Sequence, residues 1–207
     1  MTTNLLDYPP ERSIDSARPG YDPAAAIIAS KANLAALAQE VDDICTERGF
    51  YAPPSVSAQP VTEIVLTEAA AAVAKIGQIH GEIDELLAVT SPGELPEEFA
   101  DVAIRVLHLA GAGSLDLDAI LCSQPPRPFG IVWTIKDAVV ILHEQASKIG
   151  NAARRSQQHA FEVELAYLWA AVVRCSYSFG IDLIPAIRAK MEKNAARPRL
   201  HGHTSQL

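Results

Sequence analysis

Apolar residues recur every three or four positions through most of this chain, which is the spacing of one buried face of an α-helix. Two of these stripes are clear: Ile76, Ile79, Ile83 and Leu86, and then Phe99, Val102, Val106 and Leu109. Runs of β-branched residues such as IVW at 131–133 are short and flanked by Pro or Gly, so no strand pair is expected. The pattern predicts an all-α fold.

Proline, glycine and capping residues divide the chain into segments. Residues 1–22 are rich in proline and polar residues, which predicts an extended arm, and Asp22-Pro23 is a typical helix start. Helices are expected at about 23–48, 62–89, 95–112, 134–155, 158–179 and 183–196. Residues 121–133 contain three prolines and are not expected to form a regular element.

Composition excludes several classes of function. The net charge of −8 over 207 residues argues against a nucleic-acid binder, which would need a basic surface. No stretch is long and apolar enough for a bilayer, and the N-terminal sequence lacks the pattern of a secretory signal. The three cysteines are far apart, which favours reduced thiols over disulfides or a metal site. A cytoplasmic protein that binds neither membrane nor nucleic acid is expected.

Two acidic pairs are the main candidates for chemistry. Glu82 and Glu85 lie in GEIDELL, and Glu98 and Asp101 lie in PEEFADV, each pair with the spacing i, i+3 that places both carboxylates on one helix face. The turn at 92–96 lets the two helices fold back on each other. Carboxylates about 4 Å apart repel by several kcal/mol at an effective protein dielectric, so four together would need a cation. Oxygen ligands without a thiolate favour Mg²⁺ or Mn²⁺.

The alternative for these acids is plain surface charge, because such pairs are common on solvated helix faces. Glu82 and Asp101, however, lie at the margins of the two apolar stripes, which favours a specific role. Asp84 and Glu97 lie on the far faces and are expected to be solubilising charges.

The second half of the chain resembles the first. Residues 102–120 and 168–187 each read as an apolar helix, a turn with small residues and a hydrophobic–Asp–Leu step, with Asp116 and Asp182 66 positions apart. At this offset Glu98 corresponds to Glu164 and Asp101 to Tyr167. Upstream, KIGQIHGEIDELL resembles AVVILHEQASKIG, and a separate alignment that places Glu82 on Glu144 pairs Glu85 with Ser147. We therefore predict a tandem repeat, 23–120 and 134–203 joined by a linker at 121–133, in which only the first copy keeps its acids. Chance likeness between two amphipathic helices is the alternative.

The order of the motifs resembles a known family. An ExxE pair, twelve intervening residues and an ExxD pair are typical of the MazG-like all-α nucleoside triphosphate pyrophosphohydrolases. The tail MEKNAARPRLHGH is similar to the family's closing segment, with Lys190, Asn194, Arg197 and His201 at the matching positions. The resemblance covers about 30–203, with 121–160 atypical.

This resemblance implies a helical bundle of MazG-like type, which the repeat would turn into a pseudo-dimer. It also implies hydrolysis of a nucleoside triphosphate to a monophosphate and pyrophosphate. Mg²⁺ held by the four acids would neutralise the triphosphate, and Glu85 is the expected acceptor of a proton from water. Five residues are implied in substrate binding: Lys190, Asn194, Arg197, His201 and Phe50. Members with one module per chain usually dimerise, so a homodimer is a further expectation.

Other classes of function were weighed against this one. A catalytically weak nucleotide-binding or regulatory protein would keep the fold and lose turnover. A di-iron carboxylate bundle would need Glu-x-x-His pairs, and none of the six histidines has Glu three residues before it. The basic residue that often follows ExxE in the family is missing, since LLAVTS follows here.

Overall fold

The computed structural model describes residues 33–48 and 68–196, and this part of the chain is helical. Its helices are α2 (Leu34–Arg48), α3 (Glu68–Ala88), α4 (Leu95–Ala112), α5 (Leu117–Ser123), α6 (Ile135–Arg154), α7 (Gln158–Ser178) and α8 (Leu183–Ala195). No strand occurs in these two ranges, so the predicted all-α class is confirmed. The expected arm at 1–22 and the predicted helical residues 23–32 and 62–67 lie outside the described residues.

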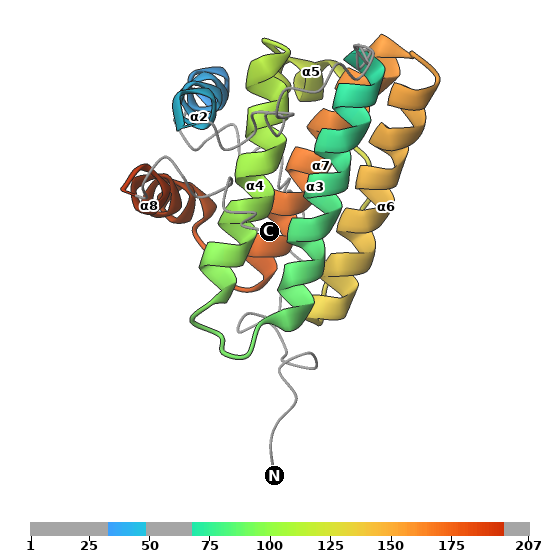
Figure 1. Cartoon of the computed structure of the whole chain (residues 1–207). Coiled ribbons are helices and arrows are strands. Elements are labelled where there is room, and N and C mark those ends of the chain that lie inside the picture. Colours follow the sequence, from blue (N-terminus) through green and yellow to red (C-terminus); the bar gives the residue numbers. More distant parts are fainter. Residues whose placement is uncertain (1–32, 49–67, 197–207) are drawn as a thin grey trace, which may run out of the picture.

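Four long helices form the centre of the molecule. Figure 1 shows α3, α4, α6 and α7 side by side, with α2 and α8 both lying against the outer side of α4. The eight apolar residues of the two predicted stripes are all buried in this bundle. The helical spacing therefore correctly identified the faces of α3 and α4 that meet the core. Glu82, Glu98 and Asp101 lie at the edge of these faces and are partly buried.

Local signals set the turn that brings α3 and α4 together. The Glu94 carboxylate accepts hydrogen bonds from the backbone N–H of Thr90 (2.9 Å) and of Ser91 (3.3 Å), which closes the loop. Pro96 occupies the first turn of α4, where its missing N–H costs no helical hydrogen bond. The observed bounds of α4 match the predicted 95–112.

The prediction for residues 121–133 was wrong at its start. Helix α5 continues to Ser123, because the first proline of the segment is Pro125 and nothing before it interrupts a helix. Asp116 caps α5 by accepting a hydrogen bond from the backbone N–H of Ala119 at 3.0 Å. Leu117 is fully buried and anchors the helix in the core. From Gln124 to the start of α6 the chain is irregular, as expected.

The α4–α5 and α7–α8 connections have the same geometry. The helix pairs bend by 89° and 102°. Ser114 and Gly180, 66 positions apart, both have a positive φ, of 51° and 72°. The next residue in each turn donates its backbone N–H five residues back, from Leu115 to Ala110 (2.9 Å) and from Ile181 to Ser176 (3.1 Å). Both bends are thus left-handed helix caps of one type.

The two short helices after these bends cross over to the other half. Helix α5 packs against α7, and α8 packs against α4. Helix α8 thereby lies against the helix that carries Glu98 and Asp101.

No single helix in the described ranges combines the length and apolar character needed to cross a bilayer, and α4–α5 and α7–α8 reach that level only as bent pairs.

Candidate functional site

The predicted acids of α3 and α4 lie close enough to influence one another. Glu98 is half-buried, and burial raises its pKa, with the charges of Asp101 and Glu85 acting in the same direction. Burial also raises the pKa of Asp101, to which the charge of Glu82 contributes. All four predicted ligands therefore belong to one electrostatic cluster, although Glu85 is exposed.

One carboxylate oxygen of this cluster has no partner. Oε2 of Glu98 is buried and makes no hydrogen bond within the described part of the protein. A buried, unpaired carboxylate oxygen is costly, and such an atom at a native site calls for a reason such as a bound ion. Glu98 is thus the residue of the cluster best prepared to receive a cation.

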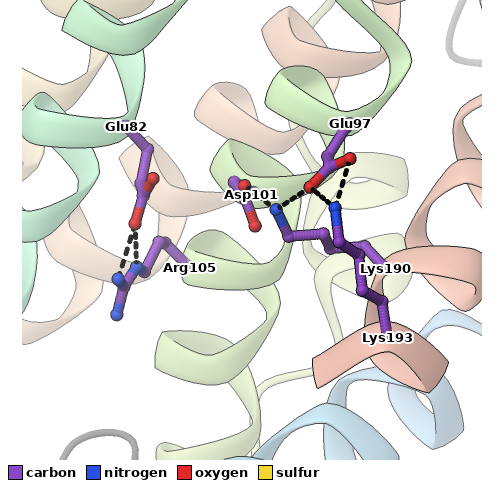
Figure 2. A network of polar contacts seen from close by, with 6 residues as sticks. All are labelled: Glu82, Glu97, Asp101, Arg105, Lys190 and Lys193. Atoms are coloured by element: carbon purple, nitrogen blue, oxygen red, sulfur yellow. Dashed lines mark hydrogen bonds and ion pairs between the residues drawn. The ribbon is translucent and has the colours of Figure 1, made fainter. Parts of the chain in front are cut away.

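Asp101 and Glu82, the other half-buried acids of the cluster, already have cationic partners. Oδ2 of Asp101 lies 2.5 Å from Nζ of Lys190, which reaches it from α8, and Figure 2 shows the ammonium lying between Asp101 and Glu97. Burial disfavours the charged ammonium, but hydrogen bonds to Asp101 and Glu97 outweigh that effect and raise the pKa of Lys190. Lys190 serves two carboxylates, so it does not compensate fully for the burial of Asp101.

The expectation for Glu97 was wrong. It is not a plain solubilising charge, since Oε1 lies 2.7 Å from Nζ of Lys190 and 2.6 Å from Nζ of Lys193. Hydrogen bonds from these two lysines lower the pKa of Glu97 to about 2. Asp84, the other expected solubilising acid, accepts a contact of 3.0 Å from Nε2 of His143 on α6.

Arg105 is a site residue that the sequence analysis missed. Its Nε and Nη2 lie 2.7 Å and 2.5 Å from Oε1 of Glu82, so the guanidinium joins α4 to α3 (Figure 2). Arg105 lies one helical turn after Asp101, a spacing that places both side chains on one face of α4. That i, i+4 relation was visible in the sequence.

The side chains as placed do not yet form a complete set of metal ligands. In the described ranges, no three His, Cys, Asp or Glu side chains are positioned to hold one metal ion. The chemistry of the donor set nevertheless fits a hard cation, because it consists of carboxylate oxygens, one of them buried and unpaired. For all four acids to bind one metal ion, Glu82 would have to release Arg105, and Asp101 would have to release Lys190.

The predicted substrate-binding residues are only partly visible. Asn194 follows Lys190 by one turn on α8, and its Oδ1 is buried without a hydrogen-bond partner in the described residues. An amide oxygen of this kind is available to a ligand on the face of α8 that carries Lys190. Phe50, Arg197 and His201 lie outside the described residues.

Comparison with known protein families, curated proteins and solved structures finds no match to this chain.

Proposed function

We propose that this protein is a Mg²⁺- or Mn²⁺-dependent hydrolase that cleaves a nucleoside triphosphate to a monophosphate and pyrophosphate, with a fold of the MazG-like type. The observation that carries the proposal is the buried, unpaired oxygen of Glu98 beside Asp101 and Glu85, on the helix that α8 covers with Lys190. Acids of α3 and α4 lie there beside a lysine of α8, an arrangement that supports the proposal.

Each residue has a task in this proposal. Glu82, Glu85, Glu98 and Asp101 would hold the divalent ion, which would supply charge neutralisation at the phosphates. Glu85, the exposed acid, is the proposed acceptor of the proton that the attacking water loses. Lys190 can leave Asp101 for a phosphate oxygen, since a lysine ammonium on a flexible four-carbon chain adapts easily to a new partner.

The tandem repeat is the structural part of the proposal. It is supported by the similar bends after α4 and after α7, of 89° and 102°, and by the reciprocal packing of α5 on α7 and α8 on α4. In a fused pair, each half would contribute its short helix to the acids of the other. One complete site per chain follows, because Ser147 and Tyr167 stand where the second copy would need acids.

A catalytically weak nucleotide-binding protein is the second candidate. The observation that favours it is the existing neutralisation of Glu82 by Arg105 and of Asp101 by Lys190, which leaves fewer ligands free for a metal. A protein that keeps these ion pairs would bind a triphosphate through the exposed Lys193 without turning it over.

The test is a panel of ribo- and deoxyribonucleoside triphosphates, incubated with Mg²⁺ or Mn²⁺ and scored separately for pyrophosphate and monophosphate. We expect both products in equal amounts from at least one base, with no reaction in excess chelator. Glu98→Gln, which keeps the side-chain shape and removes the charge, is the matched inactive variant. Binding of triphosphates without turnover would support the second candidate, and neither binding nor turnover would exclude both.

A further inference from the structure

Arg127 lies in the proline-rich segment between α5 and α6, and it reaches the acid-bearing face of α7. Its guanidinium bonds both oxygens of the Glu164 carboxylate, with Nη2 2.9 Å from Oε1 and Nη1 on Oε2. Nη1 also donates to Oε1 of Gln145 at 3.0 Å. The guanidinium carbon lies 3.6 Å from the centre of the Tyr167 ring, which is the geometry of a cation–π contact.

The partners of Arg127 occupy the positions that correspond to the acids of the first half. Glu164 and Tyr167 lie 66 positions after Glu98 and Asp101. Glu144, the counterpart of Glu82, is also within the electrostatic reach of Arg127. The arginine thus lies among three of the four positions that would hold a metal in an intact second copy.

The segment that carries Arg127 is itself fixed in place. The Tyr167 hydroxyl donates a hydrogen bond of 2.6 Å to the backbone oxygen of Pro125, two residues before Arg127. Tyr167 therefore does two things that an aspartate at this position would not do, since it anchors the segment and offers its ring face to the guanidinium. The tyrosine at position 167 and the arginine beside it therefore belong to one arrangement.

We propose that Arg127 is an internal cation that takes, in the second half, the place that the divalent ion has in the first, so that the chain holds one metal site and not two. The comparison with a divalent ion rests on the proposed function of the first half. The contacts of Arg127 with Glu164, Gln145 and Tyr167 are independent of that function. A guanidinium is always charged and presents a rigid set of donors that fits a carboxylate through two bonds. It neutralises Glu164 permanently, without depending on a metal supply.

The first experiment tests the internal cation without any metal. Arg127→Met, Glu164→Gln and the double variant are compared with the wild type by thermal unfolding in chelator. Arg127→Met leaves the Glu164 carboxylate partly buried and unpaired, so we expect a melting temperature lower by about 10 °C. Adding Glu164→Gln should recover at least half of that loss. Equal melting temperatures for Arg127→Met and the wild type would overturn the proposal.

The second experiment counts metal ions. Arg127→Ser combined with Tyr167→Asp removes the internal cation and restores an acid beside Glu164 and Glu144. After equilibrium dialysis against Mn²⁺, this variant should retain one more ion per chain than the wild type. An equal count overturns the proposal. Tyr167→Asp alone, which keeps Arg127, is the matched control and should gain none.

The outcomes for the two sites are distinguishable. A wild type that binds no Mn²⁺ contradicts the proposed function of the first half, while a gain of one ion in the double variant still supports the role of Arg127. Should the variant that combines Arg127→Ser with Tyr167→Asp fail to fold, Arg127→Ser alone tests the proposal. A larger Mn²⁺-induced rise in its melting temperature than in the wild type supports the proposal, and an equal rise overturns it.

Discussion

The first half of this protein carries an acidic cluster on α3 and α4, the second half carries acids on α6 and α7, and the two sets are compensated in different ways. In the first half, the carboxylates of Glu82 and Asp101 depend on Arg105 and Lys190, and one oxygen of Glu98 is left without a partner. In the second half, a single arginine bonds both oxygens of Glu164. The difference shows how one helical framework can leave one cluster able to accept a ligand and complete the other with its own side chain.

The source of the cation explains the difference. Arg127 belongs to an irregular segment that contains three prolines and is tied to Tyr167 by a hydrogen bond, so its position is constrained. Lys190 and Lys193 extend from α8 on flexible side chains and share Glu97. A lysine can change partners at little cost, whereas a guanidinium held by two bonds and a ring cannot.

The largest expected difference between the halves is in catalysis. If the proposed function holds, Glu98→Gln should lower the rate of pyrophosphate release by at least about 100-fold, equivalent to about 2.7 kcal/mol of activation free energy, because it removes the proposed metal ligand with the unpaired oxygen. Glu164→Gln, the corresponding change in the second half, should leave the rate within about three-fold. Steady-state assays at saturating Mg²⁺ measure both.

The same pair of variants should change stability in opposite directions. The raised pKa of Glu98 means that its charged form destabilises the fold, so Glu98→Gln should raise the melting temperature at pH 8. Glu164→Gln leaves Arg127 without its carboxylate partner and should lower the melting temperature. Equal losses of activity in the two variants would contradict the assignment of the site to one half.

The contact with α2 is a second difference between the halves. A Cβ added at Gly111 on α4 would lie 2.4 Å from the backbone oxygen of Ala38 and 2.8 Å from Cβ of Asp42, so α2 can approach only a glycine here. Gly111→Ala should therefore cost about 3 kcal/mol of unfolding free energy, measured in urea. At the corresponding position, 66 residues on, Tyr177 is exposed, and Tyr177→Ala should cost less than about 1 kcal/mol.

Gly77→Ala on α3 is the control for this comparison. A Cβ at Gly77 would meet nothing within 4 Å, so alanine should stabilise the helix by up to about 1 kcal/mol. A tolerated Gly111→Ala would contradict the close packing of α2 on α4.

His108 makes the stability of the first half depend on pH. Burial, together with the charges of Lys75 and Arg105, lowers its pKa to about 4 despite the contact of 3.2 Å with Asp42. As the pH falls, His108 takes up a proton near pH 6.5 in the unfolded chain but only near pH 4 in the folded protein. The contribution of neutral His108 to the free energy of unfolding is therefore complete above pH 6.5 and is lost as the pH falls towards 4. Between pH 7 and 4.5 we expect a loss of about 2.5 kcal/mol that His108→Gln does not show.

The residue that lies 66 positions after His108 is Arg174, so this buried histidine is not repeated at that position. Urea denaturation at several pH values, for the wild type and His108→Gln, measures the effect. Parallel pH profiles for the two proteins would mean that the pKa of His108 is the same in the folded and unfolded states, and the assigned effect of burial would be wrong.

The local patterns in the sequence were enough to identify most of the helices and one side of the site. The apolar stripe from Phe99 to Leu109 and the turn before it predicted α4 to the residue, because periodicity and a proline in the first turn are local properties. The spacing of Glu98 and Asp101 likewise identified the electrostatic cluster, since it depends on one helix face. Helix α5 was recognised only as the step after Asp116, and its end was placed too early.

The partners of the acids could not be predicted in the same way. Lys190 bonds Glu97 across 93 positions, and Arg127 bonds Glu164 across 37. Such pairs depend on how α8 and the proline-rich segment cross the bundle, which no local spacing encodes. The assignment of Glu97 to the solvated face failed for this reason, because the face was correct for α4 alone but not after α8 had packed on it.

The smallest expected effect concerns the left-handed caps at Ser114 and Gly180, two of the three residues with a positive φ in the described ranges. A residue with a side chain loses about 1 kcal/mol relative to glycine at a positive φ, so Gly180→Ser should destabilise the protein by about that amount. No atom lies within 4 Å of a Cβ at Gly180, which leaves backbone conformation as the only cost. Ser114→Gly makes the reverse change at φ 51° and should be neutral or stabilising by up to about 0.5 kcal/mol, since glycine also gains freedom in the unfolded chain. Urea midpoints resolve the two signs. Effects of the same sign would mean that the two bends do not impose the same backbone conformation, and the correspondence between the halves would then not extend to the turns that direct α5 and α8 across the bundle.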